Sequence, residues 1–281
     1  MDTGTSDPSG TSTQTSVLPS SGYIGDFAVG KVPTNTPPTL NAYIYPTEDN
    51  VSSHPITFTD DTAWRSHISL VTAQLGTGGV VHNLTAGVDY TDSAGILKLI
   101  PTTSDNYLTT SGNYTISVYA TGYLGTSVIQ RINAGSATKL GISVQPAAPT
   151  TNGGLLATQP VILIQDQYGN TANSTATVNA TVGSGTWTIG GTTSRSGVGG
   201  VATFTSLTGT SYGADTAVIQ FSSTGLTSVS SNAMILPAPN PPSLTAATGA
   251  TVDASFNITF TDNPAWRASV TSVQVLSLIH I

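Results

Sequence analysis

Cysteine is absent from the 281 residues of this chain, and charged residues make up only 7% of them. Without cysteine there is no disulfide, no thiolate metal site and no cysteine nucleophile. An ordinary globular domain carries roughly 25% charged residues, so the polar surface here must come mainly from Ser, Thr, Asn and Gln. Amphipathic helices place Lys and Glu on their outer faces. The composition therefore predicts strands and turns rather than long helices.

Basic residues are scarcer than acidic ones. The 7 Lys and Arg stand against 14 Asp and Glu, and the formal net charge is −7. Nucleic acid and anionic membrane surfaces are bound by clustered Lys and Arg, so we expect neither as a partner. Residues 1–16 lack the basic start and apolar stretch of a signal peptide, and no apolar run has the length of a transmembrane helix. We expect no membrane insertion within this chain.

A sequence repeat organises the chain. Residues 56–65 read ITFTDDTAWR, and 202 positions later residues 258–267 read ITFTDNPAWR, so eight of ten residues are identical. A Pro-Pro-x-Leu segment precedes each copy, at residues 37–40 and 241–244. We therefore expect an array of modules, because repeated segments of this kind mark repeated structural units.

The expected boundaries follow from composition and from the repeat. Residues 1–36 are rich in Ser, Thr, Gly and Pro, which predicts a linker or the tail of a preceding module. A first module is expected at 37–134, a second at 135–237, and a truncated copy of the first at 238–275. The truncated copy lacks counterparts of the later strands of the first module, so we expect it to be mobile in solution.

The last six residues have a second interpretation. Residues 276–281 read LSLIHI, the in-frame translation of the transposon mosaic end CTGTCTCTTATACACATCT used in sequencing libraries. We interpret them as a sequencing-adapter scar, to be set aside in reasoning about the fold. A genuine apolar terminal strand is the alternative.

The fold class that the sequence predicts is mostly β, built from tandem small β-sandwich modules. Tyr114, Ile116 and Val118 alternate with polar residues, the period of a strand with one buried face. Asp61 is a helix N-cap signal, and the residue at the same position of the other copy, Asn263, precedes a proline, which strengthens the signal. This predicts a short helix near 62–68 with Trp64 and Ile68 on one face. After residue 135, short apolar segments alternate with polar turns such as 166–170, as in a β-sandwich.

Few residues have the arrangement that catalysis or metal binding requires. The histidines at 54, 67 and 82 are isolated and lack the spacing of a metal motif. Two acidic pairs, 60–61 and 89/92, do not match a calcium loop with alternating oxygen ligands, and roles in turns and caps are simpler. There is no nucleophile elbow and no phosphate-binding glycine loop. We expect no catalytic, cofactor or metal site, and hence not an enzyme.

Four residues are candidates for binding another protein. Trp64 and Arg65 belong to residue types that dominate interface hot spots. A buried core role for Trp64 is the favoured alternative, because aromatic residues supply much of the core of a small domain. Tyr119 lies on the polar phase of its strand and Tyr123 follows close behind. Each of these tyrosines either contacts a partner or covers the sheet.

Two family resemblances now have their residues in place. The first resemblance rests on five segments: PPxL at 37–40, ITFTDDTAWR at 56–65, LTAGVDY at 84–90, SGNYTISV at 111–118 and ATGY at 120–123. Together they resemble the Shr-like haemoglobin-interacting domain. The resemblance covers about 37–133, with the truncated copy at 241–275. Residues 135–237 resemble bacterial Ig-like modules of invasin-type surface proteins. The matching segments are ATKL at 137–140, QP at 145–146, LATQPV at 156–161, DQYGN at 166–170 and GVATF at 200–204.

The resemblances imply a bacterial cell-surface or secreted protein of Ig-like β-sandwich modules. The expected function is non-enzymatic: stalk or display modules and binding of an extracellular protein or glycan. One alternative is a receptor for haemoglobin or another host haemoprotein through residues 37–133. That segment has no Cys or Met and only isolated His, so direct haem ligation is not expected. A second alternative is a set of accessory domains of a secreted polysaccharide-degrading enzyme.

Overall fold

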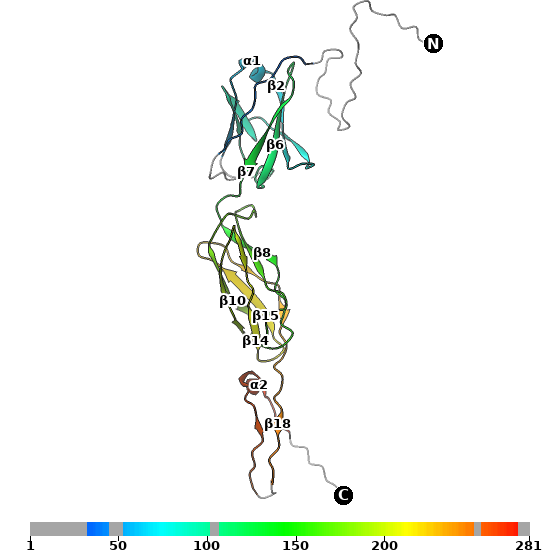
Figure 1. Cartoon of the computed structure of the whole chain (residues 1–281), viewed down its shortest axis with the longest axis vertical. Coiled ribbons are helices and arrows are strands. Elements are labelled where there is room, and N and C mark those ends of the chain that lie inside the picture. The colour runs from blue at the N-terminus through cyan, green and yellow to red at the C-terminus, as the bar shows by residue number, and fades with distance from the viewer. Residues whose placement is uncertain (1–32, 45–52, 102–106, 250–253, 275–281) are drawn as a thin grey trace, which may run out of the picture.

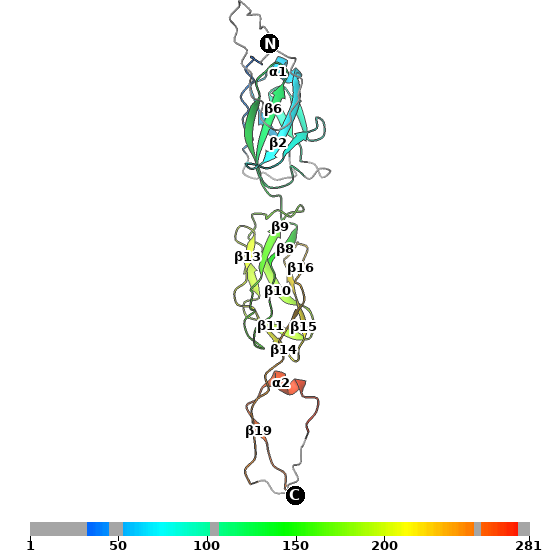
Figure 2. The same ribbon diagram turned by 90° about the vertical axis from the view of Figure 1, so that its right-hand side faces the viewer.

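The computed structural model describes residues 33–44, 53–101, 107–249 and 254–274. Three parts follow one another along the long axis of the chain, as both ribbon views show (Figures 1 and 2). Two of these parts have a hydrophobic core of their own. The residues of one core come from the sequence range 40–132, and those of the other from 140–236. The segment 276–281, interpreted as a scar, and most of the expected linker 1–36 lie outside the described residues.

The first module is residues 33–133, and two antiparallel sheets form it. One has the order β3-β2-β6-β7 and the other the order β1-β5-β4. The strands are β1 (His54–Thr57), β2 (Ile68–Leu75), β3 (Val81–Leu84), β4 (Tyr90–Ser93), β5 (Ile96–Leu99), β6 (Gly112–Ala120) and β7 (Thr126–Ile132).

The core of this module lies between the two sheets. Tyr114, Ile116 and Val118 of β6 and Leu97 and Leu99 of β5 are completely buried, whereas the residues between them are not. This period of two is the one read from the sequence, and it leaves one face of each sheet in the core. The mostly-β sandwich that the sequence predicts is confirmed.

A short helix, α1 (Thr62–Ser66), connects β1 to β2. Its N-cap is Asp61, whose side chain accepts a hydrogen bond from the backbone N–H of Trp64 at 2.9 Å, as the sequence predicts. The expectation that the helix continues to residue 68 is wrong, because Ile68 is the first residue of β2 and pairs with Ala120. The β-branched residues that follow fit the long β2–β6 ladder better than a helix.

The second module is residues 135–237. One sheet has the order β13-β9-β8, a larger one contains β12-β10-β15-β16 with β17 also on β15, and β11 pairs with β14. The strands are β8 (Lys139–Val144), β9 (Val161–Gln165), β10 (Thr177–Ser184), β11 (Trp187–Gly190), β12 (Ser194–Ser196), β13 (Val201–Thr203), β14 (Thr208–Ser211), β15 (Thr216–Ser222), β16 (Val229–Ser230) and β17 (Met234–Ile235). Phe204 and Phe221, with ring centroids 5.6 Å apart, lie in its core.

The third part, residues 241–274, is called the half-module below. It contains β18 (Leu244–Thr245), β19 (Thr259–Phe260) and α2 (Pro264–Ser269). Asn263 caps α2 with φ −127° and ψ 96°, nearly the values of Asp61 in the first copy, −128° and 100°. The identical residues of the repeat therefore adopt the same local structure. None of the helices in the described segments is long and apolar enough to cross a membrane.

Candidate functional site

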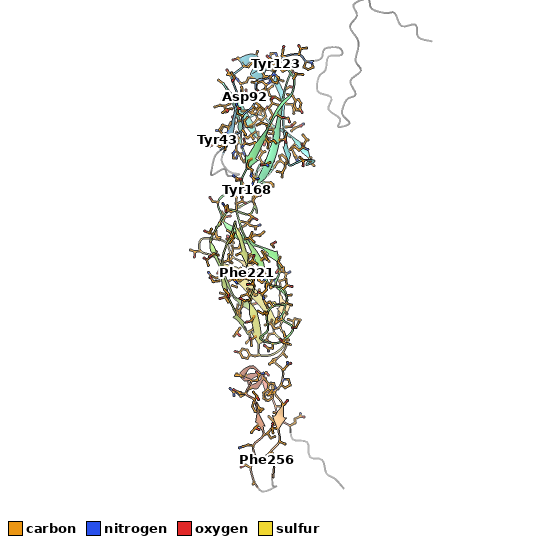
Figure 3. All side chains as sticks on the ribbon, in the orientation of Figure 1. Tyr43, Asp92, Tyr123, Tyr168, Phe221 and Phe256 are labelled. Atoms are coloured by element: carbon orange, nitrogen blue, oxygen red, sulfur yellow. The ribbon has the colours of Figure 1, made fainter. Side chains whose placement is uncertain are left out.

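The end of the first module that lies away from the second module is the candidate site. It is called the α1 end below, after the helix that Figure 1 shows there. The β4–β5 turn reaches it through the hydrogen bond from Gly95 to Asp60, and the β6–β7 turn through the one from Thr121 to His67. Figure 3 shows Tyr123 at this end and Tyr168 at the opposite end, where the second module begins. Its polar and aromatic residues are Asp60, Arg65, His67, Tyr119 and Tyr123, and Leu124 is an exposed aliphatic residue beside them.

Arg65 is fixed by Asp60. The Nε of Arg65 donates to Oδ1 of Asp60 at 3.1 Å, and the same carboxylate accepts the backbone N–H of Gly95 at 3.1 Å. These hydrogen bonds, led by the one from Arg65, lower the pKa of Asp60 below its ordinary value. The half-module repeats the pair, with Arg267 Nη1 donating to Asp262 at 2.6 Å. Arg65 is thus an ordered, partly exposed cation beside the β4–β5 turn.

The aromatic part of the α1 end belongs to the other sheet. Tyr119 is 42% exposed and Leu124 is 47% exposed, both at the β6–β7 turn. A Cβ at Gly125 would lie 3.1 Å from the Tyr119 ring, so the ring lies directly on this glycine. The ring centroids of Tyr123 and His67 are 6.5 Å apart, and the backbone N–H of Leu124 donates to the carbonyl of Asn35. The turn is held in place while its apolar side chains face solvent.

Trp64 does not belong to this surface. Its side chain is completely buried and meets the Phe58 ring edge-on, with centroids 5.1 Å apart at 74°. A ring with no exposed surface cannot contact a partner while the module is folded, so the expectation that Trp64 binds a partner is corrected. The alternative that the sequence favoured, a core residue, is the one the structure has.

The histidines and aspartates considered as ligands each make local contacts. His67 Nδ1 lies 2.7 Å from the Ala63 carbonyl, and His82 stacks on Tyr107 with centroids 3.6 Å apart. The buried carboxylate of Asp89 accepts the backbone N–H of Thr85 at 2.8 Å and closes a turn. Within the described segments, no group of three or more His, Asp or Glu side chains is placed to hold a metal ion.

A second structured feature, called the joint below, connects the first and second modules. Asn170 donates through Nδ2 to the Thr109 carbonyl at 2.8 Å, and its Oδ1 accepts the Ser111 N–H at 2.9 Å. Asp166 accepts the backbone N–H groups of Tyr168 and Asn170, as well as that of Gly135. The turn at 166–170 is the one read from the sequence, but its contact with the first module was not predicted.

Gln130 is a completely buried polar residue whose role the sequence did not reveal. Its carboxamide accepts the Tyr43 N–H at 2.8 Å and donates to the Tyr43 carbonyl at 2.9 Å, in the way that a neighbouring strand would. The sequence signal that could have revealed Gln130 is the alternation along β7, where Gln130 shares the inward-facing positions with Val128 and Ile132. A polar residue in that phase requires a buried hydrogen-bond partner.

Comparisons with known proteins bear on the first module. Residues 43–133 match the family model described as "Heme-binding protein Shr-like, Hb-interacting domain". No curated protein sequence matches the chain. Among solved structures, the D00-D0 domain of intimin is 16% identical, and the match covers 70% of this chain and 98% of that one with a TM-score of 0.35.

Other similar structures are more distant. FN1–FN3 of chicken CNTN1 is 11% identical, with a TM-score of 0.33 and coverage of 75% of this chain and 72% of that one. The Tp47 lipoprotein of Treponema pallidum is 10% identical, with a TM-score of 0.30 and coverage of 75% and 53%. These likenesses carry no argument about function. Within this chain, residues 43–133 are similar to the family of Shr-like haemoglobin-interacting domains.

Proposed function

We propose that this chain is a non-enzymatic part of a modular extracellular protein, in which the first module binds a protein partner and the second displays it. The observation that carries the proposal is the α1 end. Arg65 lies in α1, and Tyr119 lies against Gly125 beside the β6–β7 turn. Figure 3 shows Tyr123 at this end of the module, which the second module does not cover. Tyr and Arg are the residue types that most often dominate binding energy at interfaces.

Order at the α1 end supports binding. Arg65 is already paired with Asp60, and the Tyr119 ring is supported by Gly125, so both groups are fixed before a partner arrives. A fixed side chain loses less conformational entropy on binding than a mobile one.

Haemoglobin is the partner that we propose, because the family description names it. The contact would be with the globin surface. Axial ligands of haem are His, Met, Cys or Tyr side chains that face an apolar pocket. In the first module there is no Cys or Met, His54 is completely buried, and His67 and His82 make the local contacts described above. These histidines do not fit haem ligation.

Display is supported by the joint. Two hydrogen bonds between the Asn170 side chain and the first module, one donated to Thr109 and one accepted from Ser111, limit bending between the modules. The hydrogen bond from the Gly135 N–H to Asp166 adds to this restraint. Because bending at the joint is restricted, the α1 end stays at a distance from the surface to which the second module is attached. Location outside the cell is part of the same proposal, by analogy with the families that the two modules resemble.

Binding of haemoglobin to the immobilised chain tests the proposal by interferometry. We expect micromolar binding that weakens at least about tenfold in each of the variants Tyr119→Ala, Tyr123→Ala and Arg65→Ala. The matched controls are Tyr212→Ala in the second module, where the ring is 40% exposed, and Arg131→Ala at the far end of the first module. No binding of the unmodified chain at about 100 μM would reject haemoglobin as partner. Equal losses in the controls would reject the α1 end as the site.

A further inference from the structure

The sheet β3-β2-β6-β7 of the first module has a second face, turned away from the core and called the outer face below. At its centre β2 and β6 lie side by side (Figure 2). Thr115 and Ser117 of β6 alternate with the completely buried Tyr114, Ile116 and Val118, so they belong to the outer face. Residues directly opposite each other in an antiparallel pair point to the same side. The strand register therefore identifies the other members of the outer face.

Two rows of side chains cross the outer face from β3 to β7. The first row is Val81, Gln74, Thr115 and Ile129, and the second is Asn83, Thr72, Ser117 and Ser127. Neighbouring strands lie about 4.8 Å apart. The rows therefore present hydroxyl and amide groups at a regular repeat across the sheet.

Polar groups of these rows are not engaged by the protein itself. Within the described part of the chain, no side-chain hydrogen bond involves Asn83, Thr115, Ser117 or Ser127. Their hydroxyl and amide groups can therefore bind a ligand without breaking a contact of the fold.

The outer sheet of the second module, which contains β10 and β12, differs in this respect. There the hydroxyls of Thr177 and Ser196 lie 3.2 Å apart, and Ser194 donates to Asn179 at 2.9 Å. These side chains satisfy one another across the strands. The comparison singles out the first module as the one with polar groups available to a ligand.

Charge is nearly absent from the four strands. Arg131 is their only Lys, Arg, Asp or Glu, and its Nε donates to Asn133 at 2.8 Å. His82 lies opposite the buried Ala73 and so belongs to the other face. A charged partner finds little complementary charge here, so the surface favours a neutral one.

The distribution of apolar groups argues against a protein as the partner of this face. Protein interfaces have an apolar centre and a polar rim. The outer face has the reverse order, because Val81 and Ile129 stand at the two ends of the first row, 55% and 64% exposed, with polar residues between them. A partner with many hydroxyl groups along its length fits this order better.

An aromatic platform adjoins the rows. Tyr119 lies opposite Leu70 on the outer face, and a Cβ at Gly125 would be 3.1 Å from its ring. The ring is thus supported from one side and remains 42% exposed. The face of an aromatic ring is electron-rich, so it attracts the weakly positive C–H groups of a sugar ring.

We propose that the outer face binds a neutral, extended glycan, a chain of β-1,4-linked hexoses. One sugar ring packs on Tyr119, and the hydroxyl groups of the following rings bond to Thr115, Ser117 and Ser127. A repeating row of polar groups suits a repeating chain, and an extended chain can follow the sheet where a coiled α-1,4-linked chain cannot. This site is additional to the one proposed for haemoglobin and shares only Tyr119 with it.

Titration of the whole chain with cellopentaose, followed by backbone-amide NMR, tests the proposal. We expect a dissociation constant of about 1 mM or tighter, with shifts confined to amides of β2, β3, β6 and β7 and the β6–β7 turn. The double variant Thr115→Val/Ser117→Ala removes two hydroxyls and should weaken binding at least about tenfold. The matched control is Thr181→Val in the second module, where the hydroxyl donates to the Gln220 carbonyl, and it should bind like the unmodified chain.

Several results would overturn the glycan site. One is the absence of shifts on the outer face at about 5 mM cellopentaose, five times the expected dissociation constant. Another is unchanged binding by the double variant, whose own spectrum shows whether it is folded. A third is equal or tighter binding of maltopentaose, which is coiled, or of a hyaluronan hexasaccharide, which is anionic. The double variant should still bind haemoglobin, because Arg65 and Tyr123 are untouched, so either proposal can fail while the other stands.

Discussion

The side chain of Asn170 in the second module binds the backbone of Thr109 in the first, at 2.8 Å across 61 positions of sequence. The same side chain accepts the N–H of Ser111, so one amide group satisfies a donor and an acceptor of the neighbouring module. Hydrogen bonds to backbone groups fix position as well as distance. We regard this contact as the main restraint on bending between the two modules.

Replacement of Asn170 by alanine should loosen the joint without unfolding either module. The backbone N–H of residue 170 can still bind Asp166, so the turn is retained while both side-chain bonds to the first module are lost. Residual dipolar couplings should give one alignment tensor for both modules in the unmodified chain and two different tensors in the variant. Asn173→Ala, at an exposed position of the same loop, is the control. A single tensor in Asn170→Ala would mean that other contacts hold the joint.

Trp64 and Trp266 occupy the same repeat position, but we expect that only the replacement of Trp64 lowers the stability of a module. Trp64→Ala removes a completely buried ring and should cost the first module about 3–5 kcal/mol in the free energy of unfolding. Trp266→Ala should leave the unfolding of both complete modules unchanged, because no core depends on it. Urea titration followed by circular dichroism measures both.

Trp64→Phe separates packing from hydrogen bonding. The Nε1 of Trp64 is buried and has no hydrogen-bond partner among the described residues, so phenylalanine removes volume but breaks no hydrogen bond. We expect a smaller loss than for alanine. A loss for Trp64→Ala below about 1 kcal/mol would contradict the core role.

Tyr114, which is completely buried, and Tyr107, which is partly buried, should make the first module sensitive to alkali. Tyr114 donates to the carbonyls of Tyr107 and Thr110, and burial raises the pKa of both Tyr107 and Tyr114. Unfolded tyrosine titrates near pH 10. Because the folded pKa is the higher one, the stabilising effect is complete below about pH 10 and is lost as the pH rises further.

The measurement is the urea midpoint of the first module between pH 8 and 11.5. We expect Tyr114→Phe to lower stability by about 1–2 kcal/mol at pH 8, through two lost hydrogen bonds, and to flatten the decline above pH 10. Tyr212→Phe, at an exposed ring, should change neither quantity. An unchanged alkaline slope in Tyr114→Phe would show that other groups cause the decline.

Gln130 should tolerate no apolar substitute of similar shape. Gln130→Leu leaves the N–H and the carbonyl of Tyr43 without their buried partner, and each such group costs about 1–3 kcal/mol. Gln167→Leu, at an exposed site, is the matched control and should be neutral. Thermal unfolding of the two variants, compared with the unmodified chain, decides the point. An equal melting temperature for all three would mean that Tyr43 finds other partners.

The features that the sequence predicted are those with a short-range signal. The cap at Asp61 and the turn at 166–170 depend on residues two to four positions apart. Strand alternation in β6 placed Ile116 inside and Tyr119 outside. The end of α1 was misjudged because a spacing of four between Trp64 and Ile68 fits a helix as well as a helix followed by a strand.

The features that escaped prediction join distant parts of the chain. Gln130 and Tyr43 lie 87 positions apart, and the partners in the joint lie 59 and 61 positions apart. The periodicity of a sequence does not reveal contacts over such distances along the chain, since these contacts depend on how the sheets pack together. At the α1 end, Leu124 was missed for the same reason, although the glycines on either side of Tyr123 and Leu124 indicated an exposed turn.

The repeated segment has a consequence for the order of folding. The first module and the half-module share the N-cap, the edge-on pair of aromatic rings and the Asp–Arg pair. The two copies are alike in these features although the half-module has far fewer strands. Local residues therefore specify this geometry, and the covering strands stabilise it. During synthesis the ribosome releases this segment before β6 and β7 exist, so it can form this geometry transiently and serve as a nucleus on which the later strands condense.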